Sequence, residues 1–97
     1  MQIREFQRMI DEVFGAKDRA RGIDGTYRWF SEEVGELARA IRKQDRDNLE
    51  EEFADVLAWL ATMASICEVD LEAAAAKKYP GCCLRCGESP CGCKEST

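Results

Sequence analysis

Histidine is absent from this 97-residue chain, and proline occurs only twice. Without histidine, a cysteine nucleophile has no imidazole to activate it, and the Glu-x-x-His motifs of a ferritin-like di-iron site have no counterpart. Basic residues are also in deficit, because 14 Lys and Arg face 19 Asp and Glu for a net charge of −5. This balance argues against a nucleic-acid polymer as the primary partner, whereas a bound divalent cation would let an acidic protein take a nucleotide.

Long apolar runs are missing as well. The least polar stretch, Val56 to Cys67, is too short to span a bilayer, and residues 1–6 are amphipathic rather than a secretory signal. All six cysteines lie at or after Cys67, five of them within the last sixteen residues, whereas a secreted disulfide scaffold spreads its cysteines through the fold. We therefore expect a cytoplasmic protein that does not associate with membranes.

The composition and the spacing of the apolar residues predict helices. Alanine and glutamate are abundant, and valine and isoleucine recur at helical rather than alternating spacing. The predicted fold class is all-α, a helical bundle of about four helices built on a central antiparallel hairpin, with residues 1–80 as the domain and 81–97 as a cysteine-rich tail. The expected helices run from Ile3 to Phe14, from Thr26 to Lys43 with Asp24 as N-cap, from Asp47 to Cys67 with a capping box of Asp47 and Glu50, and from the cap Asp70 to Lys78, before Pro80.

Each of the two hairpin helices carries an apolar stripe with the alternating 4-3-4 spacing of a packed seam. The joint between the helices, Gln44 to Asp47, is short enough to make them antiparallel neighbours. We therefore expect the two stripes to form the seam of the hairpin. Their members are Phe30, Val34, Leu37 and Ile41 on the first helix and Leu49, Phe53, Val56 and Leu60 on the second.

Two matched carboxylate pairs flank that seam. At about 100° per residue, Glu33 and Glu36 lie roughly 70° and 130° to one side of the first stripe, and Glu52 and Asp55 have the same offsets on the second helix. All four are therefore predicted to lie on one side of the hairpin at similar depth. Such pairs are often only a solvated helix face. The alternative is a groove that needs a cation, and an all-oxygen ligand set suits Mg²⁺ or Mn²⁺.

The same residues resemble the signature of a known family. Glu32-Glu33-x-x-Glu36, followed after fifteen residues by Glu52-x-x-Asp55, is similar to the EExxE…ExxD pattern of the MazG-like all-α nucleotide pyrophosphohydrolases. The resemblance implies the all-α NTP pyrophosphatase fold and hydrolysis of an NTP or dNTP to the monophosphate and pyrophosphate. It also implies that the metal ligands, for Mg²⁺ or Mn²⁺, are Glu33, Glu36, Glu52 and Asp55.

A catalytic base is expected among the same carboxylates. Glu32 points farther round its helix than the others, so it is a candidate to take a proton from the attacking water, to support a ligand, or to serve a neighbouring subunit. Glu33, if weakly held as a ligand, is the other candidate.

Substrate contacts are expected from cations and aromatic rings. Lys77 and Lys78 are candidate phosphate contacts, with a favourable charge effect at a helix C-terminus as the alternative. Trp29, Trp59 and Phe6 are candidates to stack on the base, with core packing or a subunit interface as the alternative.

The tail has a spacing of its own. Cys83-x-x-Cys86, four residues, and then Cys91-x-Cys93 is the compact pattern of a zinc knuckle, in which a structural Zn²⁺ orders a segment too short and polar to fold otherwise. A pair of disulfides and a disordered, reduced tail are the alternatives.

The expected function is Mg²⁺-dependent hydrolysis of nucleoside triphosphates by a homodimer or homotetramer. The resemblance to the MazG-like family implies an oligomer, and the size of the chain favours one, because a small hairpin with two short extra helices leaves its groove half open. The alternative is a non-catalytic helical adaptor whose zinc tail binds another protein and whose carboxylates are only a solvated face. Turnover of triphosphates distinguishes the two.

Overall fold

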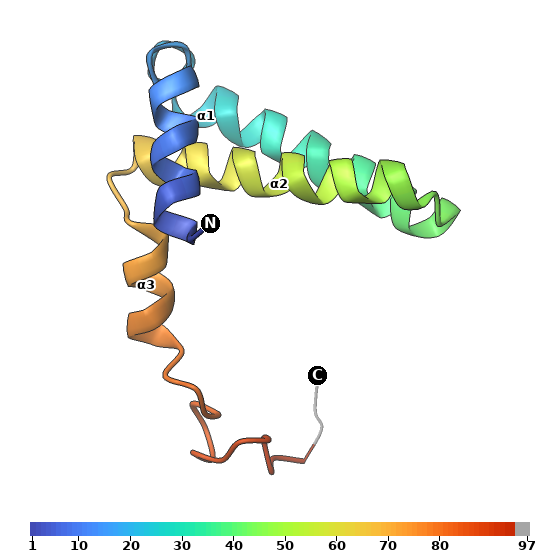
Figure 1. Cartoon of the computed structure of the whole chain (residues 1–97), viewed down its shortest axis with the longest axis vertical. Helices are drawn as coiled ribbons and strands as arrows, with labels where there is room; N and C mark the ends of the chain where they lie inside the picture. The colour runs from blue at the N-terminus through green and yellow to red at the C-terminus, as the bar shows by residue number, and fades with distance from the viewer. Residues whose placement is uncertain (95–97) are drawn as a thin grey trace.

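The computed structural model describes residues 1–94 and contains three helices, α1 (Ile3–Lys43), α2 (Arg46–Ile66) and α3 (Leu71–Lys78) (Figure 1). These residues include no strand, so the all-α class is confirmed. Three helices replace the predicted four, because the first two expected helices are one element. The end of the expected tail, residues 95–97, lies outside the described residues.

α1 is bent at a single glycine. Helical structure continues through Gly15 and Gly25, and only Gly22 leaves the helical region, with φ 87° and ψ 169°. Glycine adopts a positive φ without the Cβ clash that other residues meet, so the chain changes direction here (Figure 1). The buried Thr26 hydroxyl donates to the Gly22 carbonyl oxygen at 2.8 Å and secures the first turn after the bend. Asp24, predicted as the N-cap of a separate helix, instead lies inside α1.

The joint between α1 and α2 is shorter than predicted. Gln44 adopts a left-handed conformation with φ 55°, and Asp45 is the N-cap of α2, accepting from the backbone N–H of Asn48 at 3.4 Å. The predicted capping box at Asp47 and Glu50 is therefore wrong. α2 then runs back beside the part of α1 that follows the bend (Figure 1). The predicted cap of α3 is confirmed, since Asp70 accepts from the backbone N–H of Ala73 at 3.1 Å.

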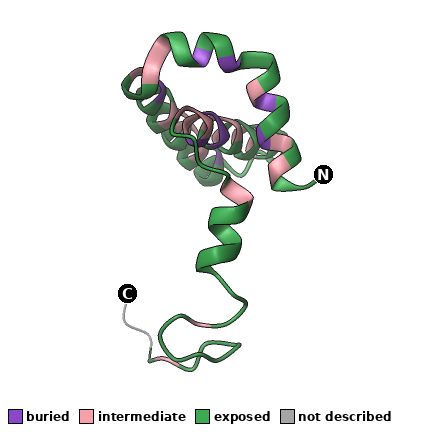
Figure 2. Ribbon diagram, turned by 90° about the vertical axis from the view of Figure 1, so that its left-hand side faces the viewer, coloured by how far each residue is buried: buried purple, intermediate pink, exposed green. Residues whose placement is uncertain are grey.

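The N-terminal segment of α1, residues 3–21, crosses the end of the α1–α2 pair, and part of the small core lies at this crossing (Figure 2). The buried amide of Gln7 holds the α2–α3 connection there, donating to the Val69 carbonyl oxygen at 2.8 Å and accepting from the Leu71 N–H at 3.0 Å. Arg4 forms ion pairs with Asp70 and Glu72. These contacts fix the start of α3, whereas the rest of α3 and the tail extend away from the bundle (Figure 2).

The predicted apolar seam is wrong for half of its members, because Val34, Ile41, Phe53 and Leu60 are exposed. The line of α1 that packs against α2 lies one residue earlier, at Thr26, Glu33 and Ala40; Thr26 and Ala40 are 0 % exposed and Glu33 is half-buried. One residue turns a helix by about 100°. This rotation brings carboxylates into the seam. The half-buried line of α2 consists of Leu49, Glu52, Val56, Trp59 and Met63.

Across residues 1–94, no helix is both long enough and apolar enough to cross a bilayer.

Candidate functional site

Three glutamates converge in the seam between α1 and α2. One carboxylate oxygen from each of Glu33, Glu36 and Glu52 lies within 4.8 Å of the others. The i, i+3 spacing places Glu33 and Glu36 on one side of α1, and the rotated seam places Glu52 opposite them. Within residues 1–94, the Oε2 atoms of Glu33 and Glu52 are buried and have no hydrogen-bond partner. A buried unsatisfied acceptor costs about 1–3 kcal/mol and more when charged, so these oxygens favour a proton or a cation.

The ionisation of this cluster is opposed by its surroundings. Burial, followed by the negative charges of Glu36, Asp55 and Glu52, raises the pKa of Glu33 to about 7. Burial also raises the pKa of Glu52, again with contributions from Glu36 and Asp55. A divalent cation among the carboxylates would reverse both causes, because it replaces lost solvation and neutralises the like charges.

The structure brings together three of the four carboxylates that were predicted to share a groove. Asp55 stands at the edge of the cluster: it is exposed, one turn beyond Glu52, and lines an adjoining cleft. It is still within electrostatic reach, since its charge contributes to the raised pKa of Glu33. Glu32 is exposed and lies outside the cluster.

The adjoining cleft has a volume of about 370 Å³ and lies between the N-terminal segment of α1 and α2. Asp55 and Trp59 line it from α2, and the cations Lys17 and Arg21 line it from α1. One cleft thus combines a carboxylate next to the acidic cluster, two cations and an indole ring. Its other lining residues are Ile10, Phe14, Asp18, Ala58 and Thr62.

The two tryptophans predicted to stack on a base contact each other instead. Trp29 and Trp59 are stacked, with ring centroids 6.1 Å apart and an interplanar angle of 12°. The guanidinium carbon of Arg21 lies 5.0 Å from the centroid of the Trp59 ring. Trp59 lines the cleft, whereas Trp29 and Phe6 are not among its lining residues.

Arg21 is held in place by buried groups. Its Nη1 lies 3.1 Å from Oδ1 of the buried Asp18 and donates to Thr26 Oγ1 at 3.1 Å. The other oxygen of Asp18, Oδ2, accepts from the Thr62 hydroxyl at 3.1 Å. A guanidinium fixed in this way is pre-oriented, so it loses little side-chain entropy when an anion binds.

The sequence analysis missed Lys17 and Arg21, although a signal for them exists. Ile10, Phe14, Lys17 and Arg21 follow the same 4-3-4 spacing as the hairpin stripes and therefore share one helix face. Three glycines between residues 15 and 25 made this stretch look like a loop. Because only Gly22 breaks the helix, the face persists and forms one wall of the cleft.

The predicted phosphate contacts Lys77 and Lys78 lie elsewhere. Both are exposed in the last turn of α3, and the Lys78 ammonium lies 5.6 Å from the centroid of the Tyr79 ring. α3 extends away from the α1–α2 pair (Figures 1 and 2), so within one chain the structure does not bring these lysines to the glutamates.

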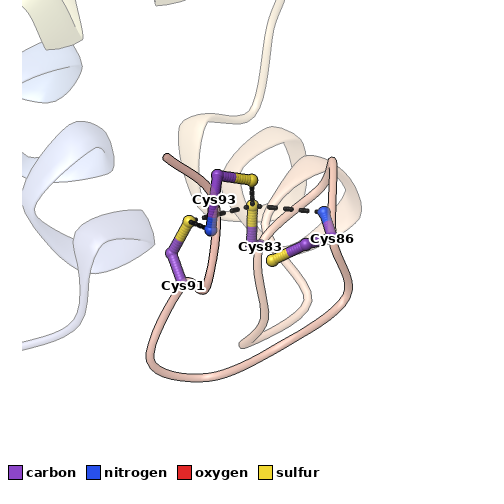
Figure 3. A group of neighbouring side chains, drawn as sticks. All are labelled: Cys83, Cys86, Cys91 and Cys93. Carbon is purple, nitrogen blue, oxygen red and sulfur yellow. Dashed lines mark hydrogen bonds between the residues drawn. The ribbon is translucent and has the colours of Figure 1, made fainter. Parts of the chain in front are cut away.

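The structure brings the four predicted zinc ligands together. The Sγ atoms of Cys83, Cys86, Cys91 and Cys93 all lie within 4.8 Å of one another (Figure 3). Neither Cys82 nor Cys67 belongs to this group. Cys67 is the C-cap of α2 and is exposed.

Residues 21–81 match the family model described as the MazG nucleotide pyrophosphohydrolase domain. The match begins at Arg21 in the cleft and includes all of the glutamate cluster. No curated protein sequence matches the chain.

Proposed function

Because this chain belongs to the MazG nucleotide pyrophosphohydrolase family, we propose that it hydrolyses nucleoside triphosphates, NTP or dNTP, to the monophosphate and pyrophosphate with Mg²⁺ as cofactor. The observation that carries the proposal is the pair of buried carboxylate oxygens, of Glu33 and Glu52, that lack a hydrogen-bond partner among residues 1–94. An acidic seam of this kind destabilises a helical pair unless it serves a bound cation.

The donor set fits a hard divalent cation. Glu33, Glu36 and Glu52 offer oxygen ligands from two helices, and the chain has no histidine to favour a softer metal. Asp55, at the edge of the cleft, is the fourth proposed ligand. Mg²⁺, or Mn²⁺ in its place, supplies charge neutralisation at the phosphates and an acidified water.

The protein contributes positioning and proton transfer. Lys17 and the fixed Arg21 neutralise phosphate oxygens across the cleft from Asp55, and Trp59 offers an indole face to the base. A free carboxylate takes the proton of the attacking water, and Glu32 and Glu33 are the candidates. Lys77 and Lys78 remain proposed phosphate contacts only for a substrate held between two copies of the chain.

A second copy of the chain is proposed to cover the exposed stripes. Tyr27, Val34 and Ile41 recur every seven residues on α1, and Phe53, Leu57 and Leu60 form the corresponding face of α2; all six are exposed. The chain exposes 7479 Å², whereas about 5,600 Å² is typical of a compact monomer of this mass. The extended tail accounts for part of the excess. A homodimer, or a homotetramer built from it, would bury these apolar faces.

The activity is tested by incubating the chain with each NTP and dNTP, with and without Mg²⁺, and measuring monophosphate and pyrophosphate by ion-exchange chromatography. We expect equal amounts of the two products and no orthophosphate. Absence of turnover by a folded protein in the presence of Mg²⁺ or Mn²⁺ would contradict the proposal and favour the helical adaptor.

The role of the cleft is tested by Lys17→Ala. Loss of one charge-assisted phosphate contact is worth about 1.5–3 kcal/mol, so we expect kcat/KM to fall roughly 10- to 100-fold. Lys43→Ala removes the same charge at the far end of α1, outside the cleft, and should leave kcat/KM unchanged. Equal effects of the two substitutions would mean that Lys17 acts only through the overall charge.

A further inference from the structure

The tail has a definite backbone course without a hydrophobic core. Residues 79–94 contain no helix and no strand, none of them is buried, and Leu84 is 57 % exposed. The chain nevertheless folds back on itself, because the Cys83 N–H donates to the Glu88 carbonyl oxygen at 2.9 Å and the Gly87 N–H donates to the Cys83 carbonyl oxygen at 2.8 Å. Apolar burial therefore cannot explain the order of this segment.

The four sulfur atoms have the spacing of a tetrahedral metal site. Zinc–thiolate bonds of about 2.3 Å place the sulfurs of a regular tetrahedron about 3.8 Å apart. The Sγ atom of Cys83 lies 3.5 Å from that of Cys91 and 3.9 Å from that of Cys93 (Figure 3). A disulfide bond needs about 2.05 Å, and all four cysteines are free.

Backbone N–H groups point at the sulfurs. Cys83 Sγ accepts from the N–H groups of Arg85 and Cys86 at 3.4 and 3.5 Å, in a tight turn that continues into Gly87 with φ 78°. Cys86 Sγ accepts from Gly92 N–H at 3.4 Å. Such donors stabilise sulfur as thiolate, the form that binds metal.

Cys91 is oriented in the same way, since its Sγ accepts from the Cys93 N–H at 3.3 Å. The backbone of the tail thus supplies outer contacts to three of the four sulfurs. Four thiolates this close repel one another unless a cation lies between them.

We propose that the tail is a structural zinc site, in which Cys83, Cys86, Cys91 and Cys93 bind one Zn²⁺ as thiolates and the ion replaces the core that the segment lacks. Binding releases the thiol protons and leaves the site with a net charge of −2, next to the cations Arg85 and Lys94. A soft, tetrahedral, four-sulfur set selects Zn²⁺ over Mg²⁺, so the site is chemically separate from the glutamate cluster.

Cobalt substitution tests the proposal on the full chain. Purified under reducing conditions and stripped of metal, the protein should take up one Co²⁺ and show the visible absorption of tetrahedral cobalt with thiolate ligands. One equivalent of Zn²⁺ should abolish this spectrum. Cys86→Ser removes a ligand and should weaken Co²⁺ binding by more than the roughly 10- to 100-fold effect of losing an outer-shell partner.

Cys82→Ser is the matched control, because Cys82 is a neighbouring exposed cysteine outside the sulfur group. It should bind Co²⁺ as the unaltered chain does. Equal losses in the two variants, an octahedral cobalt spectrum, or a brown iron–sulfur chromophore in the isolated protein would overturn the proposal. Binding is read without any triphosphate, so the result does not depend on whether the chain hydrolyses nucleotides.

Discussion

The glutamate cluster and the cysteine cluster each gather ligand atoms within 4.8 Å, yet they depend on their surroundings in opposite ways. The glutamates project from α1 and α2, which are held by the regular backbone hydrogen bonds of α-helices. The cysteines belong to a segment with no helix, no strand and no buried residue. From this difference we infer that a metal ion reduces the electrostatic repulsion among the glutamates of the helical pair, whereas the tail needs its metal ion in order to fold.

The largest expected effect is the loss of hydrolysis in Glu52→Gln. This substitution removes one charge from the cluster and keeps the side-chain shape. The stabilisation of the transition state by the bound metal, worth several kcal/mol, should therefore be lost. We expect kcat/KM to fall about a thousandfold at saturating Mg²⁺. Glu51→Gln changes the adjacent, exposed residue of α2 and should retain full activity. If the two variants were equally active, the cluster would not be the catalytic centre.

The next effect concerns the apolar faces of the helical pair. Val34→Asp places a charge in the middle of the exposed stripe of α1 and should dissociate the oligomer, at a cost of about 2–4 kcal/mol, typical of a central interface residue. Light scattering coupled to size-exclusion chromatography measures the change in mass. Arg28→Asp introduces the same side chain about 120° round the helix and should leave the oligomer intact. A monomeric unaltered chain would refute the proposed interface.

A smaller effect is expected in the pH dependence of the metal-free protein. The pKa of Glu33 is about 7 in the folded state and about 4.3 in an unfolded chain. The folded state therefore binds more protons between these values, so the free energy of unfolding falls as the pH rises from about 4.3 to 7 and stays low above that. Because Glu33 is partly exposed and solvent screens its charge, the loss should be about 1–3 kcal/mol rather than the full value of the shift.

Urea denaturation at pH 5 and pH 8 measures this loss. Glu33→Gln should reduce it, leaving the part due to the raised pKa of Glu52, and be the more stable protein at pH 8. Glu32→Gln, on the exposed side of the same turn, should behave like the unaltered chain. A Glu33→Gln variant that is less stable at pH 8 would show that the ionised carboxylate stabilises the fold.

The smallest effect should be that of the tail on the helices. Cys86→Ser should shift the midpoint of helical unfolding, followed by circular dichroism, by no more than about 2 °C, because surface changes away from buried contacts cost less than about 0.5 kcal/mol. Trypsin should meanwhile cut after Arg85 faster in this variant than in the zinc-loaded chain. A large loss of helical stability would mean that the two regions fold together.

The sequence predicted which glutamates come together better than it predicted the packing around them. The spacing of Glu33, Glu36 and Glu52 alone brings them to one side of two neighbouring helices, and the helix propensity of the chain fixes its class. The stripe of Val34 and Ile41 looked like the seam because apolar periodicity shows which face avoids water, without showing which partner covers it. Here the carboxylates occupy the seam, and Val34 and Ile41 of the stripe are exposed.

The cleft could not be predicted from the sequence, and the reason is local. Gly15, Gly22 and Gly25 all weaken a helix, and propensity alone does not tell which of them takes a positive φ. Because only Gly22 has a positive φ, the helix face that carries Lys17 and Arg21 continues to the bend. It lines the same cleft as Trp59. The cysteine spacing, by contrast, was a sufficient guide to which sulfurs come together, since four cysteines within eleven residues leave few ways to arrange them.

The central claim, that the glutamates in the seam between α1 and α2 form a site for a hard divalent ion, is tested most directly by titrating the metal-free chain with Mn²⁺ and following the electron paramagnetic resonance signal of the free ion. We predict a saturable site that Glu52→Gln abolishes and that Cys86→Ser leaves unchanged. Mn²⁺ binding that survives Glu52→Gln, or that disappears with Cys86→Ser, would contradict the account.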